Sequence, residues 1–493
     1  MGEAVKWQFA CNFLPFHSQL TIISLYVSDE RGIFAYTLQN LIVYWNNLLL
    51  NKKNMVIDFS ISNFRSIRDK QTLSFEATNS THLEEYFVMK VGKYRLLKIA
   101  TLLGANASGK SNVLRAFYLF TDLMLHPCKD KTSEIEYERF FLDEECLQRP
   151  SEMMVNFIVG EARYKYEIVF DNKVVYHEVL KCQPLDALRE HMVYERETDK
   201  GSLVSTMKWG DRYRSVTNTR ILSGNLLHNR TLFGAYLNSN VDIPWMKSIL
   251  NWMNEYFMPM VTTGDQKLQK YVSQSLMDNL IEKSELVRQL MKADIGISDL
   301  VVEQTKRPLN PNMLDLLLHS NQIPESMKQE LKSDPTRMEF DIHMSHNGHQ
   351  GAVAMDYKQE SGGTQRYYEL SGLLLQIIKE SHFLAIDELE CRLHPDLYQH
   401  FVTTYLLNSH RSQLVFSSHL SEFLSDRDLF RDDSVWITKK SQQGDTELYS
   451  LADFDSETLR DTTNRYNAYR AGRLGGIPHL GDTYVSLSQT KES

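Results

Sequence analysis

Cysteine is scarce and scattered in this chain of 493 residues. The five cysteines form no C-x-x-C pair and no other paired spacing; they are Cys11, Cys128, Cys146, Cys182 and Cys391. This pattern argues against a disulfide framework and against a zinc site, and it favours a reducing compartment. We therefore expect a cytoplasmic protein.

An excess of positive charge is also missing, because the formal net charge is −9. No global basic field draws the chain onto nucleic acid, although local basic patches are compatible with this total. Long apolar runs are missing as well. The apolar segment 33–50 is interrupted by five polar residues, Thr37, Gln39, Asn40, Asn46 and Asn47. Since a membrane span needs about 20 mostly apolar residues, we expect no span there, and the N-terminus shows no cleavable signal pattern.

What is present is the composition of an ordinary globular protein, with 42% hydrophobic and 24% charged residues. Residues 1–54 differ in character from the rest of the chain, and we treat them as an N-terminal extension of uncertain status. Met55 opens the better patterned part of the chain. Alternation of apolar and polar residues predicts a β-hairpin and then an antiparallel β subdomain. The predicted strands are 55–67, 71–75, 153–159, 164–170 and 174–180.

The texture changes to helical spacing from about residue 188 to residue 292. Helices are predicted for 245–256 and for 272–291, the second with one apolar stripe. That stripe consists of Leu276, Leu280, Val287 and Met291. Two interpretations stay open: a helical insertion packed on itself, or a protruding arm that contacts a partner. Further on, paired strands are predicted around the turn Asn347-Gly348. His343, His346 and His349 lie on this hairpin, and we do not expect them to bind a metal.

The organising motif is G-x-x-x-x-G-K-S, a phosphate-binding loop between a predicted strand, 98–103, and a predicted helix, 112–125. Glycines let backbone N–H groups turn toward a polyphosphate, the lysine reaches the β- and γ-phosphates, and the serine hydroxyl binds Mg²⁺. The loop residues are Gly104, Ala105, Asn106, Ala107, Ser108, Gly109, Lys110 and Ser111, followed by Asn112 at the helix start. A glycine turn without a ligand is the alternative, and the flanking elements disfavour it.

Three later stretches predict the rest of an ATP site. An apolar strand ends in Asp387 and Glu388, which suit Mg²⁺ binding and activation of a water molecule. A second short strand ends in Ser417-Ser418-His419, and the histidine can donate to a γ-phosphate. The third stretch places Ser361, Gly362 and Gly363 before a helix, where an anion is stabilised. Two phosphate-binding elements in one chain suggest that each nucleotide lies between two copies.

With these motifs, the chain resembles ABC-type ATPases of the group that contains RecF, SMC and OLD-family proteins. The Walker A loop is 104–111, the S-G-G-x-Q signature 361–365, Walker B 383–388 and the switch histidine His419. The segment Leu393-His-Pro395 stands at the D-loop. More closely, it resembles the stand-alone ATPases of bacterial abortive-infection and anti-phage loci, the RloA/AbiL type. The opening FSISNFRSIRDKQTLSFEA and the tail NAYRAGRLGGIP carry that likeness, at 59–77 and 467–478.

This resemblance implies an α/β fold, a P-loop NTPase of ABC-ATPase head type, with an antiparallel β subdomain and a helical insertion. It implies ATP and Mg²⁺ as cofactors, with Lys110, Glu388 and His419 catalytic and Ser111 and Asp387 on the metal. The expected partners are a second copy, head to head, and a TOPRIM- or nuclease-type effector, with DNA open and a membrane excluded. The predicted parts are 1–54 (extension), 55–187 (first part of the head), 188–292 (insertion), 293–480 (second part of the head) and 481–493 (tail).

The preferred interpretation is thus an ATP-hydrolysing dimerisation switch that regulates a nuclease-like effector in anti-phage defence. The alternative is a RecF- or SMC-like ATPase that binds DNA in repair or chromosome maintenance. Salt-dependent DNA affinity would favour the alternative, and the acidic net charge mildly disfavours it. A scaffold that does not hydrolyse ATP is disfavoured, because both carboxylates and His419 are present.

Overall fold

The computed structural model describes residues 54–264, 266–293, 295–320, 323, 325–454, 464–478 and 481–483. The predicted N-terminal extension, apart from Asn54, and most of the predicted tail lie outside these residues, as does the apolar segment 33–50. Within the described residues, no helix is long and apolar enough to cross a bilayer.

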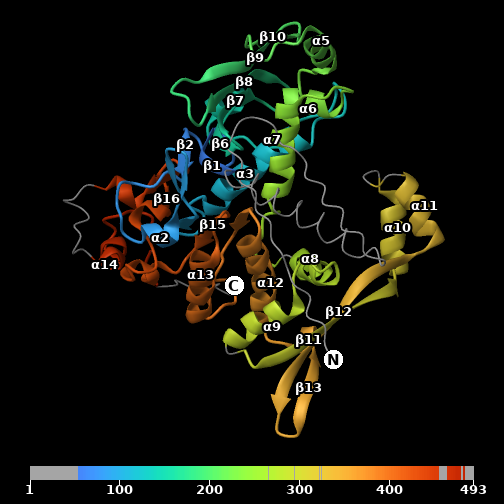
Figure 1. Ribbon diagram of the computed structural model, residues 1–493, viewed down its shortest axis with the longest axis vertical. Helices are drawn as coiled ribbons and strands as arrows, with labels where there is room; N and C mark the ends of the chain where they lie inside the picture. The colour runs from blue at the N-terminus through green and yellow to red at the C-terminus, as the bar shows by residue number, and fades with distance from the viewer. Residues whose placement is uncertain are drawn as a thin grey trace, which may run out of the picture. The chain divides into compact units, whose positions relative to one another are not determined.

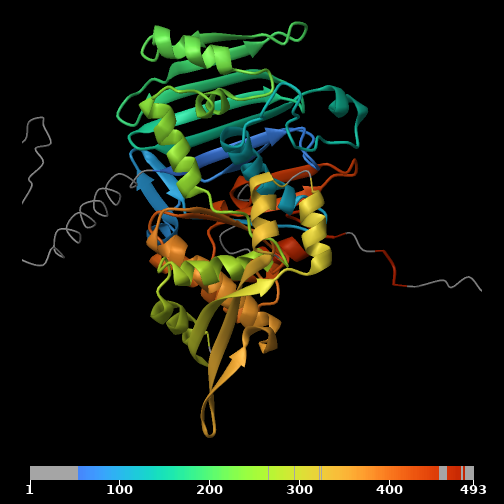
Figure 2. The ribbon, with the colours of Figure 1, turned by 90° about the vertical axis from the view of Figure 1, so that its right-hand side faces the viewer.

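The first large sheet has seven strands, all antiparallel, in the order β10-β9-β8-β7-β6-β1-β2. Figure 2 shows them in blue and green. Their bounds are β1 Met55–Ser62, β2 Gln71–Ser74, β6 Ser151–Val159, β7 Ala162–Phe170, β8 Val175–Pro184, β9 His191–Thr198 and β10 Ser205–Trp209. The predicted hairpin and the three strands after the phosphate loop are confirmed. A small hairpin, β3 Val88–Val91 and β4 Tyr94–Leu97, forms a separate two-stranded sheet.

The second large sheet has the order β14-β15-β5-β16-β17 and is parallel except for its last strand. Its strands are β5 Ile99–Leu103, β14 Phe383–Ile386, β15 Gln413–Ser418, β16 Val435–Lys440 and β17 Thr446–Ser450. Every residue of β5, β14 and β15 is buried, as expected for parallel strands covered on both faces. Because parallel strands end at one edge, the residues after β5, β14 and β15 come together there.

Helix α3 (Lys110–Leu125) packs between the two large sheets (Figure 1). Its Phe117 ring lies 4.6 Å from Phe59 of β1 and 4.8 Å from Phe383 of β14, measured between centroids. The sheets are also joined directly, because Gln413 of β15 accepts from the Val56 N–H at 2.8 Å and donates to its carbonyl at 2.9 Å. One apolar core therefore holds the phosphate loop and the acidic strand end in fixed positions.

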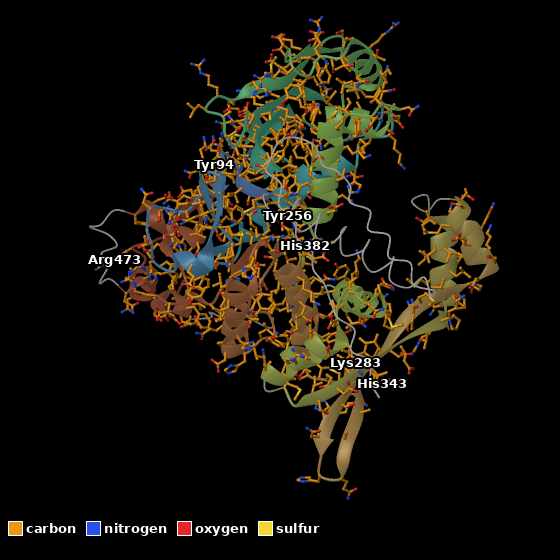
Figure 3. All side chains as sticks on the ribbon, in the orientation of Figure 1. Tyr94, Tyr256, Lys283, His343, His382 and Arg473 are labelled. Carbon is orange, nitrogen blue, oxygen red and sulfur yellow. The ribbon has the colours of Figure 1, made fainter. Side chains whose placement is uncertain are left out.

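The segment after helix α7 (Pro244–Tyr256) adds a short parallel edge beside β14. The Met258 and Val261 N–H groups donate to the carbonyls of Phe383 and Ala385 at 3.0 and 2.9 Å. Tyr256, labelled with His382 in Figure 3, donates its hydroxyl to Gln413 at 2.9 Å. The acidic strand is thus paired on both sides.

The third sheet has the order β11-β12-β13 and is antiparallel. Its strands are β11 Ile297–Pro308, β12 Thr336–Gly348 and β13 Gly351–Asp356. The predicted strand pair is confirmed, but the turn lies two residues later than predicted. Asn347 and Gly348 are the last residues of β12 and pair with Ala352 and Gly351, and the chain turns at His349 and Gln350. Helices α10 (Pro311–His319) and α11 (Glu325–Ser333) connect β11 to β12 and contain no buried residue.

The two longest of the remaining helices are α12 Gly362–Lys379 and α13 Pro395–Asn408. The shorter ones are α2 Glu84–Phe87, α4 Glu144–Gln148, α5 Val216–Asn225, α6 Leu232–Leu237, α8 Gln266–Met277, α9 Lys283–Lys292 and α14 Arg465–Arg470. Single 3₁₀ turns lie at Tyr357–Gln359, Ser421–Ser425, Asp432–Ser434 and Leu451–Asp453.

The predicted helical character of residues 188–292 is wrong at its start. Strands β9 and β10 occupy residues 191–209 and extend the first sheet. An inward position of β9 is taken by Arg196, which is 0% exposed and pairs with Glu178 at 3.3 Å. A charged residue on the buried face hides the alternation that would have indicated a strand.

The apolar stripe predicted for one helix over 272–291 is also wrong. The chain forms two helices, and Asn279 between them has a left-handed backbone (φ 58°). This break changes the helical phase, so Leu280 and Met291 are exposed while Leu286 and Leu290 are buried. Both helices pack on α12 and not only on each other. Val272 of α8 lies against Gly372 of α12, and a Cβ added to Gly372 would lie 2.5 Å from a methyl carbon of Val272.

Candidate active site

The phosphate loop runs from the end of β5 to the start of α3, as predicted. Gly109 caps the helix with φ 104°, a conformation that favours glycine. A Cβ at this position would lie 2.0 Å from the Thr446 hydroxyl oxygen. Both the backbone angle and the packed neighbour therefore require glycine here.

A chain of hydroxyl groups supports the loop from behind. Asn112 Nδ2 donates to Ser66 Oγ at 2.8 Å, and Ser66 lies 2.8 Å from Thr446 Oγ1. Thr446 in turn donates to the Ser108 carbonyl at 2.9 Å. Because each hydroxyl has one proton, Ser66 must donate to Thr446 in this chain. Ser108 Oγ is further held by Thr438 Oγ1 at 2.6 Å.

The segment after α14 reaches the same loop. The Ala105 N–H donates to the Gly476 carbonyl at 2.7 Å, and the Tyr469 hydroxyl donates to that carbonyl at 2.9 Å. Gly476 is buried and has φ 69°. No sequence signal identified Thr438, Thr446 or Gly476 as neighbours of the loop, because they lie more than 300 residues away in the chain.

Lys110 folds back over the loop. Its Nζ donates to the carbonyls of Gly104 at 2.8 Å and Ala105 at 3.1 Å, and the residue is 6% exposed. Burial lowers the pKa of Lys110 to about 8, against the opposing pull of the carboxylates of Asp387, Glu390 and Glu388. The lysine therefore lies near Asp387 and Glu388, which the sequence placed in the same site, and near Glu390, which it did not.

The acidic strand end is organised by Ser417 of β15. Asp387 is 9% exposed, and its Oδ1 accepts from Ser417 Oγ at 2.6 Å. The Glu388 N–H donates to the same hydroxyl at 2.7 Å. Glu388 itself has φ 50°, a left-handed conformation that is uncommon for a residue with a Cβ. Strained backbone of this kind is concentrated at functional sites.

His419 joins this group, as predicted. Its Nε2 lies 3.8 Å from Glu388 Oε1, and its backbone N–H donates to Glu390 Oε1 at 2.5 Å. Burial, with the nearby positive charge of Lys110, lowers the pKa of His419. The structure thus brings Lys110, Asp387, Glu388 and His419 together at one edge of the parallel sheet.

The S-G-G turn is different, because it is on the surface. Ser361 caps α12 and accepts from the Thr364 N–H at 3.1 Å. Beneath the turn, a Cβ on Gly363 would lie 2.9 Å from the Arg392 carbonyl, so glycine permits this close packing. Between described residues, no hydrogen bond or ion pair links 361–363 to the phosphate loop. In the D-loop segment, His394 is exposed and caps α13.

A family profile described as "AAA domain, putative AbiEii toxin, Type IV TA system" (AAA_21) matches residues 99–200 and 269–425, more than half of the chain. The chain belongs to the AAA_21 family. It is an AAA-type ATPase with a mixed α/β P-loop NTPase fold and antiparallel sheets. The two matched parts contain the phosphate loop, the S-G-G turn, the acidic strand end and His419, but not the segment that contacts Ala105.

Three solved structures show a weak similarity to this AAA_21 chain, at low sequence identity and low TM-score. An SMC head bound to the C-winged helix domain of ScpA is 10% identical, with a TM-score of 0.35, covering 82% of this chain and 99% of its own. The SMC head domain of Thermotoga maritima is 12% identical, with a TM-score of 0.31 and coverages of 80% and 98%. The recombination mediator RecF with ATPrS is 16% identical, with a TM-score of 0.35 and coverages of 80% and 98%. No curated protein matches the chain.

The residues of this AAA_21 site suit Mg²⁺. Ser111 and Asp387 offer hard oxygen ligands, which Mg²⁺ prefers. Asp387 is nearly buried, and within the described part of the chain no lysine, arginine or histidine forms an ion pair with it. Since a buried carboxylate is costly without a compensating cation, the site is chemically prepared for one.

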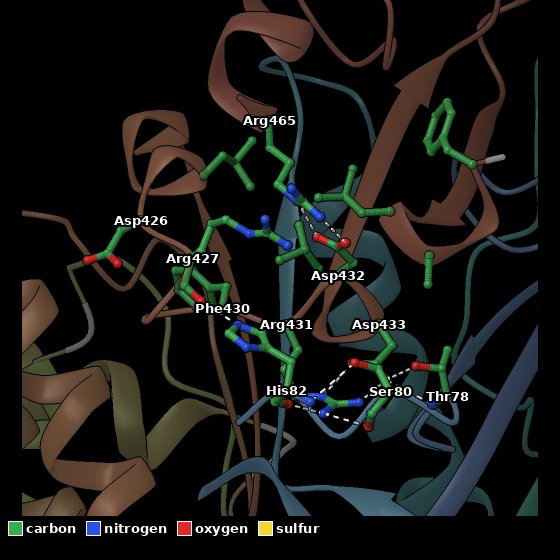
Figure 4. A pocket seen from close by; sticks show the side chains of 15 residues that line it. Thr78, Ser80, His82, Asp426, Arg427, Phe430, Arg431, Asp432, Asp433 and Arg465 are labelled. Atoms are coloured by element: carbon green, nitrogen blue, oxygen red, sulfur yellow. Dashed lines mark hydrogen bonds and ion pairs between the residues drawn. The ribbon is translucent and has the colours of Figure 1, made fainter. Parts of the chain in front are cut away.

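Other polar clusters in the described residues offer less. The hairpin residue His346 pairs with Glu360 at 2.6 Å and is not gathered with His343 and His349 into a metal site. A cavity of about 630 Å³ lies beside the 3₁₀ turn at Asp432–Ser434. Three arginines line it, and Figure 4 shows two of them bonded to aspartates: Arg431 bonds Asp433 at 2.7 Å and Arg465 bonds Asp432 at 2.6 Å. These pairs neutralise both arginines without a ligand.

Proposed function

We propose that this AAA_21 chain binds and hydrolyses ATP as a nucleotide-driven dimerisation switch. The observation that carries the proposal is the edge of the parallel sheet, where Lys110 of the phosphate loop lies among Asp387, Glu388 and Glu390. Phosphoryl transfer to water needs a cation on the phosphates and a carboxylate beside the attacking water. The loop that carries the lysine follows β5, and the carboxylates follow β14. Only β15 separates these two strands in the sheet.

In this proposal the backbone N–H groups of residues 104–112 surround the phosphates. Lys110 leaves the Gly104 and Ala105 carbonyls and binds the β- and γ-phosphate oxygens. Ser111 and Asp387 would hold Mg²⁺, which would supply positive charge beside those phosphates. Glu388 orients the attacking water and accepts its proton. His419 donates to the γ-phosphate, and its lowered pKa keeps a neutral imidazole available as donor at neutral pH.

The exposed S-G-G turn supports the dimer. Ser361, Gly362 and Gly363 present a hydroxyl and helix-start N–H groups at the surface. Among the described residues the turn makes no hydrogen bond with its own loop, and such groups stabilise an anion. We propose that they bind the γ-phosphate held by a second copy, so that ATP closes the dimer and hydrolysis opens it.

The output of the switch is proposed to be control of a nuclease-like effector in anti-phage defence. The family description supports this role, since it names a toxin of a toxin–antitoxin system. Phage plating on cells that carry the gene with its chromosomal neighbours tests it. Loss of protection with Lys110→Ala and with Glu388→Gln is expected, and protection by both variants would contradict the role.

ATP hydrolysis itself is tested with purified protein. Glu388→Gln should retain ATP binding and lose hydrolysis by about 10²- to 10⁴-fold, because an amide cannot accept the proton. Asp387→Asn should instead raise the Mg²⁺ concentration that is needed for half-maximal hydrolysis. A Glu388→Gln protein that hydrolyses ATP at the wild-type rate would show that the base lies elsewhere.

A further inference from the structure

One buried hydroxyl connects the two carboxylate residues of the acidic strand end. Ser417 is 0% exposed and lies on β15, the strand next to β14. Its Oγ is 2.6 Å from Asp387 Oδ1 and 2.7 Å from the Glu388 nitrogen. A hydroxyl has one proton and a carboxylate accepts only, so Ser417 donates to Asp387 and accepts from Glu388. The hydrogen-bond directions are therefore fixed by chemistry.

The bond to Asp387 has a consequence for its two oxygens. Oδ1 is committed to Ser417, whereas Oδ2 has no hydrogen-bond partner among the described residues. The bond also fixes the rotation of the carboxylate. An outer hydrogen bond of this kind orients a metal ligand and typically changes metal affinity about 10- to 100-fold.

The bond from Glu388 concerns its backbone. Glu388 has φ 50°, and its N–H has left the β14 ladder to reach Ser417. The next residue continues the link, because the Leu389 N–H donates to the Ser417 carbonyl at 3.1 Å. Ser417 thus holds the chain in the turn that aims the Glu388 side chain toward His419.

The neighbouring residue Ser418 is a matched contrast. It is equally buried, on the same strand, and its Oγ accepts from the Leu420 N–H at 3.0 Å. Among the described residues it bonds to neither carboxylate. The two serines differ in what they hold and hardly at all in burial.

We propose that Ser417 is a positioning residue that sets the Mg²⁺ affinity of the site through Asp387 and the placement of the water-activating carboxylate through Glu388. This inference rests on the proposed ATPase function. It assigns to a serine of the histidine strand a role that the ATP-site motifs place only on residues 387 and 388.

The test compares Ser417→Ala with Ser418→Ala in the full-length protein. Binding of a fluorescent ATP analogue is titrated with Mg²⁺, and hydrolysis is measured in parallel. The Mg²⁺ midpoint for nucleotide binding should rise about tenfold in Ser417→Ala and stay within about twofold of wild type in Ser418→Ala. ATP binding in EDTA should be the same in all three proteins, because the loop itself is intact.

Melting temperatures in EDTA control for folding. If Ser417→Ala does not fold, Ser417→Cys replaces it, since a thiol keeps the volume but donates weakly. An unchanged Mg²⁺ midpoint, or equal shifts in the two serine variants, overturns the role of Ser417. If hydrolysis still depends on Glu388 in that case, the proposed function stands alone. If the wild type binds no ATP, both proposals fall together.

Discussion

The phosphate loop and the S-G-G turn are both glycine-rich helix starts, yet the protein treats them in opposite ways. The loop is supported by hydroxyls from Ser66, Thr438 and Thr446 and by the Gly476 carbonyl. The turn at Ser361 is exposed and rests on Arg392 and its own helix. The difference indicates that the phosphate loop is held in place by its own chain. The S-G-G turn has no binding partner among the described residues.

The largest expected effect comes from breaking the two elements separately. Lys110→Ala should abolish productive ATP binding, because it removes the lysine of the loop. Ser361→Glu should leave ATP binding intact and block hydrolysis, because an acid would repel the phosphate of the second copy. Mixed in equal amounts, the two inactive proteins should recover about a quarter of wild-type hydrolysis. Half of the dimers are then mixed, and each contains one complete site.

The control for this experiment is each variant alone at the same total concentration. Absence of recovery at every mixing ratio would mean that the turn and the loop do not share a nucleotide.

A smaller effect is expected from weakening the support of the loop. Thr446→Val keeps the side-chain shape but leaves Ser66 and the Ser108 carbonyl without their partner. A lost buried hydrogen bond costs about 1–3 kcal/mol, so ATP affinity measured by calorimetry should fall at least about fivefold. Thr403→Val on α13, away from the loop, is the matched control and should bind normally. An unchanged affinity in Thr446→Val would show that the hydroxyl chain does not shape the loop.

The smallest effect is a dependence of ATP binding on pH. Burial lowers the pKa of Lys110 to about 8, so the lysine loses its charge as the pH rises through that value. Bound phosphate favours the charged form, and binding should therefore take up protons near pH 8 and weaken several-fold between about pH 7 and 8.5. Calorimetry in buffers of different ionisation enthalpy measures the uptake. In Lys110→Arg, which stays charged, the dependence should disappear.

The sequence predicts the parts of this site whose chemistry is local. The loop 104–111, the acidic strand end and His419 each carry a motif beside an apolar strand, and strand ends of a parallel sheet meet at one edge. The roles of these residues stay predictions until tested. The contacts of Ser417, Thr446 and Gly476 could not be foreseen. Ser417 and Gly476 lie in stretches that the sequence singles out, but no local pattern says which distant group a serine, a threonine or a glycine will contact.

The errors in the fold have the same origin. The buried pair of Arg196 with Glu178 depends on two strands being neighbours, and it masked β9. The break at Asn279 changed the face that α9 buries, which is decided by packing on α12. Local periodicity predicts an element well when one face is apolar, and poorly when tertiary pairing fills that face with charge.

The contact between Ala105 and Gly476 also constrains how the protein is made. Chains fold from the N-terminus during synthesis, and here the loop is translated more than 350 residues before the carbonyl that its Ala105 N–H requires. A nascent chain cannot complete this loop, so it cannot bind ATP in the described arrangement while translation is under way. The loop therefore reaches the described arrangement only once residue 476 has been made.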